Sequence, residues 1–127
     1  MNVTSVVTRL SSGIEIHHHE SGAGRALLFL HGGGPGASGL SNFQSNYAAL
    51  TAGGYRVLMP DLPGWGQSSK PSGTLDYAFL CGTLGAWLDA IGVSRCVVVG
   101  NALGGALALR IAMDQPARVS HLVLVAP

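Results

Sequence analysis

The residues best suited to chemistry lie in a glycine-rich stretch near residue 100. Gly100-Asn101-Ala102-Leu103-Gly104-Gly105 stands between an apolar, strand-like run and a run of small residues with helical periodicity. The spacing matches the G-x-S-x-G nucleophile elbow, in which a serine sits on a sharp strand-to-helix turn and small flanking residues leave room for that turn. Here the central residue is Ala102, which carries no nucleophilic atom. The motif therefore predicts that residue 102 occupies the position of a nucleophile, although an alanine cannot act as one.

Two other interpretations of the same glycines are a plain strand-to-helix turn and a nucleotide-binding turn. The first would use the glycines for close packing alone. The second would need the spacing G-x-G-x-x-G and an acidic residue about 20 positions later. That spacing is absent, and the stretch His121–Val125 contains no acid.

A second glycine-rich stretch, His31-Gly32-Gly33-Gly34-Pro35-Gly36, follows another apolar run. Glycines let the backbone approach a bound molecule, so such a loop can present N–H groups to an oxygen that becomes negatively charged in a reaction. A glycine-rich crossover loop without any chemical role is the other interpretation. Together with the elbow motif later in the chain, the order of the two stretches favours an oxyanion hole.

Both stretches need a scaffold that brings them to one edge. From residue 26 onward, apolar runs alternate with runs of helical periodicity, which predicts a mostly parallel sheet with helices on both faces. Strands are expected at Val3–Arg9, Ile14–Glu20, Ala26–Leu30, Tyr55–Pro60, Arg95–Gly100 and His121–Val125. Helices are expected around residues 43–50, 80–91 and 102–114. Both glycine-rich stretches then follow strands, at the carboxyl edge where such sheets bind ligands.

This arrangement predicts a definite geometry for the elbow. The strands Ala26–Leu30 and Arg95–Val99 should be adjacent and central in the sheet. Ala102 should lie on a tight turn with a positive φ, and Gly33 should come close to Leu103.

Four segments of the sequence resemble those of a known family. HGGGPGASGLSNF, PDLPGWGQSS, VVGNALGGALAL and PARVSHLVLVAP are similar to segments of the α/β-hydrolases that cleave carbon–carbon bonds in meta-cleavage products of aromatic degradation. The resemblance covers nearly the whole chain from about Ile14. It implies an α/β-hydrolase fold, of which this chain would be the N-terminal portion. Proline iminopeptidases and simple esterases share parts of the pattern.

The resemblance implies a role for each matching position. Ala102 stands where the family has its serine nucleophile, and the backbone N–H groups of Gly33 and Leu103 would form the oxyanion hole. The residues implied in substrate binding are Gly32, Gly34, Asn42 and Asn101. His31 would shape its loop. In the family the acid and the histidine follow the serine, which places both after Pro127, and none of the six acids present is a good substitute.

Alanine at the nucleophile position leads to three hypotheses. The chain belongs to a hydrolase made inactive by replacement of its serine, or to a non-catalytic binding or signalling member of the fold, or it is a remnant of a truncated gene. The intact glycines around Ala102 favour the first, because a strained backbone has no reason to persist in a long-dead enzyme. The expected reaction is hydrolysis of a C–C bond in a vinylogous diketone. An esterase or a peptidase-type hydrolase is the alternative.

Composition limits the partners. Charged residues make up 10% of the sequence and the net charge is +1, without a basic patch, so we expect neither nucleic acid nor a membrane surface as a partner. A small-molecule substrate without a cofactor or metal is expected. The run His17-His18-His19 lies in an expected strand, where neighbours point to opposite faces. Cys81 and Cys96 lack metal spacing and the first residues lack a signal-peptide pattern, which together favour a cytoplasmic protein.

Residues 1–127 are expected to form the N-terminal part of a single α/β-hydrolase core domain, without the cap and the C-terminal part. The apolar strand His121–Val125 would then be an uncovered edge, and such edges tend to pair. We therefore expect the C-terminal half of the same protein as a partner, and a stable free monomer of these residues is not expected. A homo-oligomer that pairs through this edge is the alternative.

Overall fold

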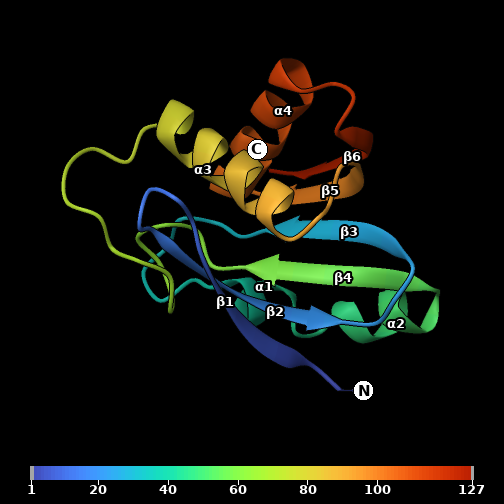
Figure 1. Cartoon of the computed structure of the whole chain (residues 1–127). Coiled ribbons are helices and arrows are strands. Elements are labelled where there is room, and N and C mark those ends of the chain that lie inside the picture. The colour runs from blue at the N-terminus through green and yellow to red at the C-terminus, as the bar shows by residue number, and fades with distance from the viewer. Residues whose placement is uncertain (1, 127) are drawn as a thin grey trace.

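A computed structural model describes residues 2–126, and these form one six-stranded sheet with helices on both faces (Figure 1). The strands are β1 (Thr4–Arg9), β2 (Glu15–Ser21), β3 (Arg25–Leu30), β4 (Tyr55–Pro60), β5 (Cys96–Asn101) and β6 (Val119–Val125). The helices are α1 (Gly39–Phe43), α2 (Tyr47–Ala52), α3 (Tyr77–Ala90) and α4 (Leu103–Asp114). The spatial order of the strands in the sheet is β1-β2-β4-β3-β5-β6.

The expected parallel sheet is confirmed for its later strands. β3 pairs in parallel with β4 on one side and with β5 on the other, and β5 pairs in parallel with β6. The strands that precede the two glycine-rich stretches are therefore adjacent and inside the sheet. Only β1 and β2 are antiparallel, joined as a hairpin that adds to the sheet through β4.

Two apolar layers hold the helices to the sheet. On one face, α3 and α4 cover a core that includes Leu28, Leu58, Val98 and the fully buried Trp87. On the other face, α1 and α2 cover a smaller core around Phe29, whose ring stacks on that of Phe43 at 4.1 Å. Figure 1 shows the two helix pairs on opposite sides of the strands. Within residues 2–126, no helix is long and apolar enough to cross a membrane.

One expected helix is divided in two. The helical spacing of Phe43, Tyr47 and Leu50 is correct, since all three side chains pack in the smaller core. A turn at residues 44–46 nevertheless separates α1 from α2. Asparagine and serine compete for backbone hydrogen bonds and so favour turns over helix interiors, and this stretch is Gln-Ser-Asn.

The three consecutive histidines of β2 alternate between the faces of the sheet. His18 points toward α3, where its ring meets the edge of Trp87 at 5.1 Å between centroids. The rings of His17 and His19 lie on the opposite face, 4.7 Å apart. Among residues 2–126, no group of three or more His, Cys, Asp or Glu side chains could hold a metal ion.

The loop that follows β4 is held by a buried carboxylate, Asp61, which is 2% exposed. Its Oδ1 accepts the Gly39 N–H at 2.9 Å, and its Oδ2 accepts the Gln67 N–H at 2.9 Å and the His17 Nδ1–H at 2.8 Å. Burial by itself would raise the pKa of this carboxyl. The hydrogen bonds from Gln67, Gly39 and His17 outweigh burial and lower the pKa below its ordinary value of 3.8.

We predict that Asp61→Asn destabilises the protein at neutral pH by about 1.5–3 kcal/mol, because the amide loses the charge and turns one acceptor into a donor that faces N–H groups. A lowered carboxyl pKa stabilises the fold above the unfolded value of 3.8 and loses that effect as the pH falls through the folded pKa. Urea unfolding should therefore give parent and variant curves that converge at low pH. The exposed Asp114→Asn is the control, with a change below about 0.5 kcal/mol. A difference that stays constant down to pH 2 would contradict this account.

Close backbone packing fixes α4 against the sheet. A Cβ atom on Gly104 would overlap the Leu30 carbonyl oxygen, and one on Gly100 would overlap the Gly104 carbonyl oxygen. The first turn of α4 thus rests directly on the end of β3, with no side chain between them. Only glycine permits this approach, which explains the glycines on both sides of the elbow.

We predict that Gly104→Ala destabilises the protein by about 1–3 kcal/mol or more, because the backbone of β3 cannot give way as a side chain would. Gly82→Ala is the matched control, since a Cβ there meets nothing within 4 Å and α3 gains helix propensity. In thermal melts of the protein at its full natural length, the Tm of Gly104→Ala should be lower than that of the parent. The Tm of Gly82→Ala should be equal to that of the parent or higher. Equal Tm values would show that the elbow packing is not tight.

Candidate active site

The elbow residue has the backbone that the motif predicts. Ala102 has φ 52° and ψ −115° and serves as the N-cap of α4. A non-glycine residue in this region is strained by about 1–3 kcal/mol unless its surroundings hold it there. Its N–H donates to the Val125 carbonyl at 2.9 Å, and its own carbonyl accepts the Gly105 N–H at 2.9 Å. The Ala102 residue is exposed, so the methyl group stands where a larger side chain could reach a ligand.

The loop after β3 comes directly against this turn. A Cβ on Gly32 would lie 3.6 Å from the Ala102 Cβ, and one on Gly33 would lie 3.0 Å from the Leu103 Cδ2. As the first residue of α4, Leu103 has a backbone N–H without an intrahelical acceptor. Within residues 2–126, the Gly33 N–H also has no backbone or side-chain acceptor. The expected proximity of Gly33 and Leu103 is therefore confirmed.

A pair of asparagines joins the loop to the elbow. The Asn42 Oδ1 accepts the Gly32 N–H at 3.0 Å and an amide N–H of Asn101 at 3.3 Å. Asn42 comes from α1 and Asn101 from the end of β5, so one amide oxygen connects three segments. Both asparagines also line a cavity of about 290 Å³, with Phe29, Phe43, Asn46, Val99 and Val125 as its other walls. The structure thus brings together Gly32, Asn42 and Asn101.

Gly34 lies apart from this group. It is exposed, and a Cβ there would meet nothing within 4 Å. Its carbonyl accepts the Ala37 N–H at 3.1 Å, which closes a turn within the loop. Nothing in the geometry of residues 2–126 places Gly34 with Ala102, and its expected contact with substrate stays a prediction.

His31 is buried and neutral. Burial lowers its pKa, and its Nδ1–H donates to the Gly32 carbonyl at 2.6 Å while its Nε2 accepts the Leu62 N–H at 3.0 Å. Both nitrogens are thereby occupied in backbone hydrogen bonds, so the imidazole has no free atom for proton transfer. This agrees with the expectation that His31 shapes its loop. The contribution of Leu62 was not indicated by any sequence motif.

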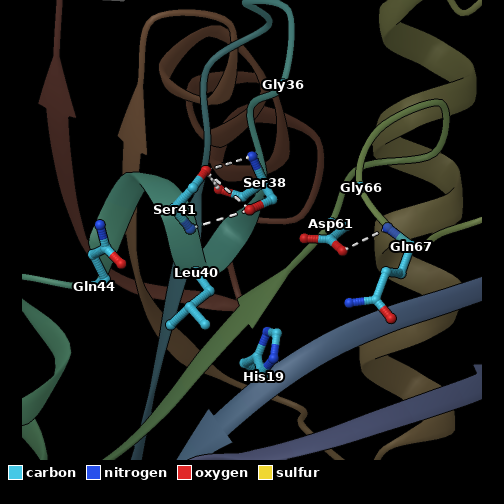
Figure 2. Close-up of a pocket in the computed structure, with 9 residues that line it drawn as sticks. All are labelled: His19, Gly36, Ser38, Leu40, Ser41, Gln44, Asp61, Gly66 and Gln67. Atoms are coloured by element: carbon cyan, nitrogen blue, oxygen red, sulfur yellow. Dashed lines mark hydrogen bonds between the residues drawn. The ribbon is translucent and has the colours of Figure 1, made fainter.

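A second cavity, of about 410 Å³, lies on the α1 side of the sheet. Figure 2 shows its walls, with His19 from β2 opposite the N-terminus of α1 and with Asp61 and Gln67 from the loop after β4. Ala102, Leu103 and the asparagines do not line it. This cavity was not expected from the sequence and is separate from the elbow.

The family model described as the alpha/beta hydrolase fold matches residues 25–127. A 2-hydroxy-6-oxo-6-phenylhexa-2,4-dienoate hydrolase from Burkholderia cepacia is 38% identical over 91% of this chain and 41% of its own length. A 2-hydroxy-6-oxononadienedioate/2-hydroxy-6-oxononatrienedioate hydrolase from Paraburkholderia phymatum is 42% identical over 94% of this chain and 43% of its own length.

Solved structures agree on the fold. A meta-cleavage product hydrolase from Pseudomonas fluorescens IP01, in the form of a serine-to-alanine mutant complexed with acetates, gives a TM-score of 0.87 at 31% identity over 95% of this chain and 43% of that chain. An epoxide hydrolase from Vigna radiata gives a TM-score of 0.88 at 28% identity over 97% of this chain and 38% of that chain.

The matches cover nearly all of this chain but less than half of each relative. The chain spans about two fifths of the length of the curated relatives it matches. All four of these proteins are named as hydrolases, and one of them is named as a meta-cleavage product hydrolase. Since the family model covers most of the sequence and two solved hydrolases share the fold, the chain belongs to the alpha/beta hydrolase fold family.

Proposed function

We propose that the protein to which this chain belongs is a serine-type hydrolase of 2-hydroxy-6-oxo-dienoates, with Ala102 at the position of its nucleophile. The observation that carries the proposal is the elbow. Ala102 holds a strained positive φ beside Gly33 and Leu103, although its methyl group gains nothing from that strain. A backbone of this kind serves a nucleophile that must stand clear of the sheet. With alanine there, the chain lacks the attacking hydroxyl.

In this proposal the oxyanion hole consists of the N–H groups of Gly33 and Leu103. Both groups lie beside Ala102 and neither has an acceptor within residues 2–126. The carbonyl carbon of the substrate would lie near the residue-102 side chain, and its oxygen would receive both N–H groups as negative charge develops. Donors that are already in place cost no reorganisation during the reaction, which makes this kind of stabilisation large.

The polar end of the substrate is proposed to lie against Asn42, Asn101 and the neighbouring backbone of Gly32 and Gly34. The asparagines face a cavity whose other walls are mostly apolar, including Phe29, Phe43 and Val99. Such a mixture suits a flat dienoate, with carbonyl and carboxylate groups at one end and a conjugated carbon chain at the other. The names of the two dienoate hydrolases support this substrate class.

The catalytic acid and histidine are proposed to come from residues outside the 127 of this chain. The curated relatives are more than twice as long as the matched part, which leaves ample chain for both groups. The same additional part is proposed to cover Val123 and Val125 of β6, which are 47% and 49% exposed. A cytoplasmic location, a single core domain and a homo-oligomer stay predictions.

A binding function without turnover is the second candidate, and Ala102 itself favours it. An elbow without a hydroxyl can still hold a carbonyl compound through Gly33 and Leu103. The two candidate functions differ in the effect expected of a serine at position 102. A hydrolase lacks only the serine hydroxyl, so the serine variant would turn over the substrate. A binding protein has no reason to keep a catalytic acid and histidine, so the serine variant would stay inactive.

We predict that Ala102→Ser, in the protein at its full natural length, produces hydrolysis of 2-hydroxy-6-oxo-6-phenylhexa-2,4-dienoate. Loss of the nucleophile in another serine hydrolase costs about a millionfold in kcat, so the parent should be silent by comparison. The rate at which the dienoate absorbance decays, under single-turnover and steady-state conditions, measures the activity of the parent and of the serine variant.

Ala102→Gly is the control, because it relieves the backbone strain without adding a hydroxyl. Equal rates for the serine and glycine variants would exclude residue 102 as the nucleophile. Tight binding of the dienoate without turnover by the serine variant would instead favour the binding function.

We predict that Asn42→Ala, in the Ala102→Ser background, lowers kcat roughly 10- to 100-fold, because Gly32 and Asn101 lose their common acceptor and the oxyanion loop shifts. Asn42→Asp should restore most of kcat, since a carboxylate oxygen accepts both N–H groups, while KM rises through repulsion of an anionic substrate. Asn46→Ala, which changes another wall of the same cavity, is the control. An aspartate variant as slow as the alanine variant would contradict the positioning role.

A further inference from the structure

A second set of hydroxyl, imidazole and carboxylate groups lies outside the elbow, at the hairpin edge of the sheet. The Ser5 Oγ lies 2.6 Å from the His17 Nε2, and the His17 Nδ1 lies 2.8 Å from the Asp61 Oδ2. Ser5 comes from β1, His17 from β2 and Asp61 from the loop after β4. The order serine, imidazole, carboxylate is the one that activates a serine hydroxyl in enzymes of unrelated fold.

The direction of each proton follows from the partners. An ionised Asp61 can only accept, and the hydrogen bonds from Gln67, Gly39 and His17 keep its pKa low despite burial. In its neutral form His17 must therefore carry its proton on Nδ1, which leaves the Nε2 lone pair toward Ser5. The Ser5 hydroxyl then donates to His17, and this is the tautomer that a general base needs.

The imidazole and the carboxylate are buried, whereas the serine hydroxyl is exposed, as a general base and a nucleophile require. His17 and Asp61 are 1% and 2% exposed, so the base and its partner are held rigidly and kept from water. Ser5 is on the outer strand of the hairpin and is exposed, so its hydroxyl can be reached by a small molecule.

The neighbours of Ser5 on this face include an exposed valine and two walls of the 410 Å³ cavity. Ser5 lies opposite His19 in the strand register, and Val7 lies opposite His17, so all four side chains share the α1 face of the sheet. Val7 is 59% exposed. His19 and Asp61, which both contact His17, are walls of the 410 Å³ cavity shown in Figure 2, and Gln67 with its side-chain amide is another.

We propose that Ser5 is a nucleophile activated by His17 and Asp61, and that it accepts acyl groups from small activated esters. The Ser5 Oγ would bond to the carbonyl carbon as its proton passes to the His17 Nε2. The bond from that carbon to the leaving oxygen would then break, and the leaving group would depart with the electron pair. The imidazolium returns its proton to the leaving group or to water. Fluorophosphonates would react in the same way at phosphorus, with fluoride as the leaving group.

The alanine at the elbow makes this proposal directly testable. In the protein at its full natural length, Ala102 has no hydroxyl that could react, so labelling by a fluorophosphonate probe reports on other serines. We expect the label on the tryptic peptide that ends at Arg9, and fragment masses should assign it to Ser5 rather than to Thr4 or Thr8. A burst of nitrophenolate from p-nitrophenyl acetate should accompany the labelling.

Variants separate activation from mere exposure. Ser5→Ala should abolish the label, while Ser45→Ala, at an exposed serine without a histidine partner among residues 2–126, should leave it unchanged. His17→Gln should slow labelling about a hundredfold, which is the effect of losing a general base. Should that variant fail to fold, shown by its thermal melt, the labelled site in the parent and the Ser5→Ala result still decide. An unlabelled Ser5, under conditions that label a known serine hydrolase, would overturn the proposal, as would equal labelling of a folded His17→Gln variant.

Discussion

The direct contact of backbone with backbone at the end of β3 is the constraint on which the elbow depends. Gly104 rests against the Leu30 carbonyl, and Gly100 rests against the Gly104 carbonyl, so β5 must turn into α4 within one residue. That residue is Ala102, and no ordinary helical or extended conformation would complete so sharp a turn, hence its φ of 52°. The same contact brings the loop after β3 beside the first turn of α4. The proximity of Gly33 and Leu103 is thus a consequence of packing and requires no ligand.

The glycine-rich loop after β3 is then held by two polar side chains, His31 and Asn42. His31 takes one hydrogen bond from the loop after β4, through Leu62, and gives one to Gly32. Asn42 draws Gly32 and Asn101 together from the side of α1. The His31 ring and the Asn42 Oδ1 both find their partners within buried or half-buried structure, where hydrogen bonds fix geometry at little net cost. A flexible glycine loop thereby has a defined position.

The extent to which sequence predicts this structure varies with the range of the interaction. The alternation of apolar runs from residue 26 onward predicts β3 to β6 and both faces of the sheet, because burial on two faces leaves a continuous apolar pattern. The strands β1 and β2 follow instead from the turn residues at 11–13 between them. Spacing around residue 102 predicts the turn, because only certain residues tolerate it. Neither pattern shows that Asp61 accepts from Gly39, Gln67 and His17, since those partners are 22, 6 and 44 residues away and any polar residue type could have been the donor. The division of the helix near residue 45 was likewise missed, because apolar spacing survives an inserted turn.

Asp61 joins the two regions that the fold otherwise separates. Its carboxylate holds the edge hairpin through His17, and its neighbour Leu62 holds the glycine-rich loop after β3 through His31. A rigid loop after β4 therefore orients two imidazoles in two different ways. His31 gives both nitrogens to the backbone and is left without one for chemistry, whereas His17 gives one nitrogen to a carboxylate and keeps the other for a hydroxyl. The difference between a structural and a reactive histidine here lies in the second partner, a main-chain N–H in one case and the exposed hydroxyl of Ser5 in the other.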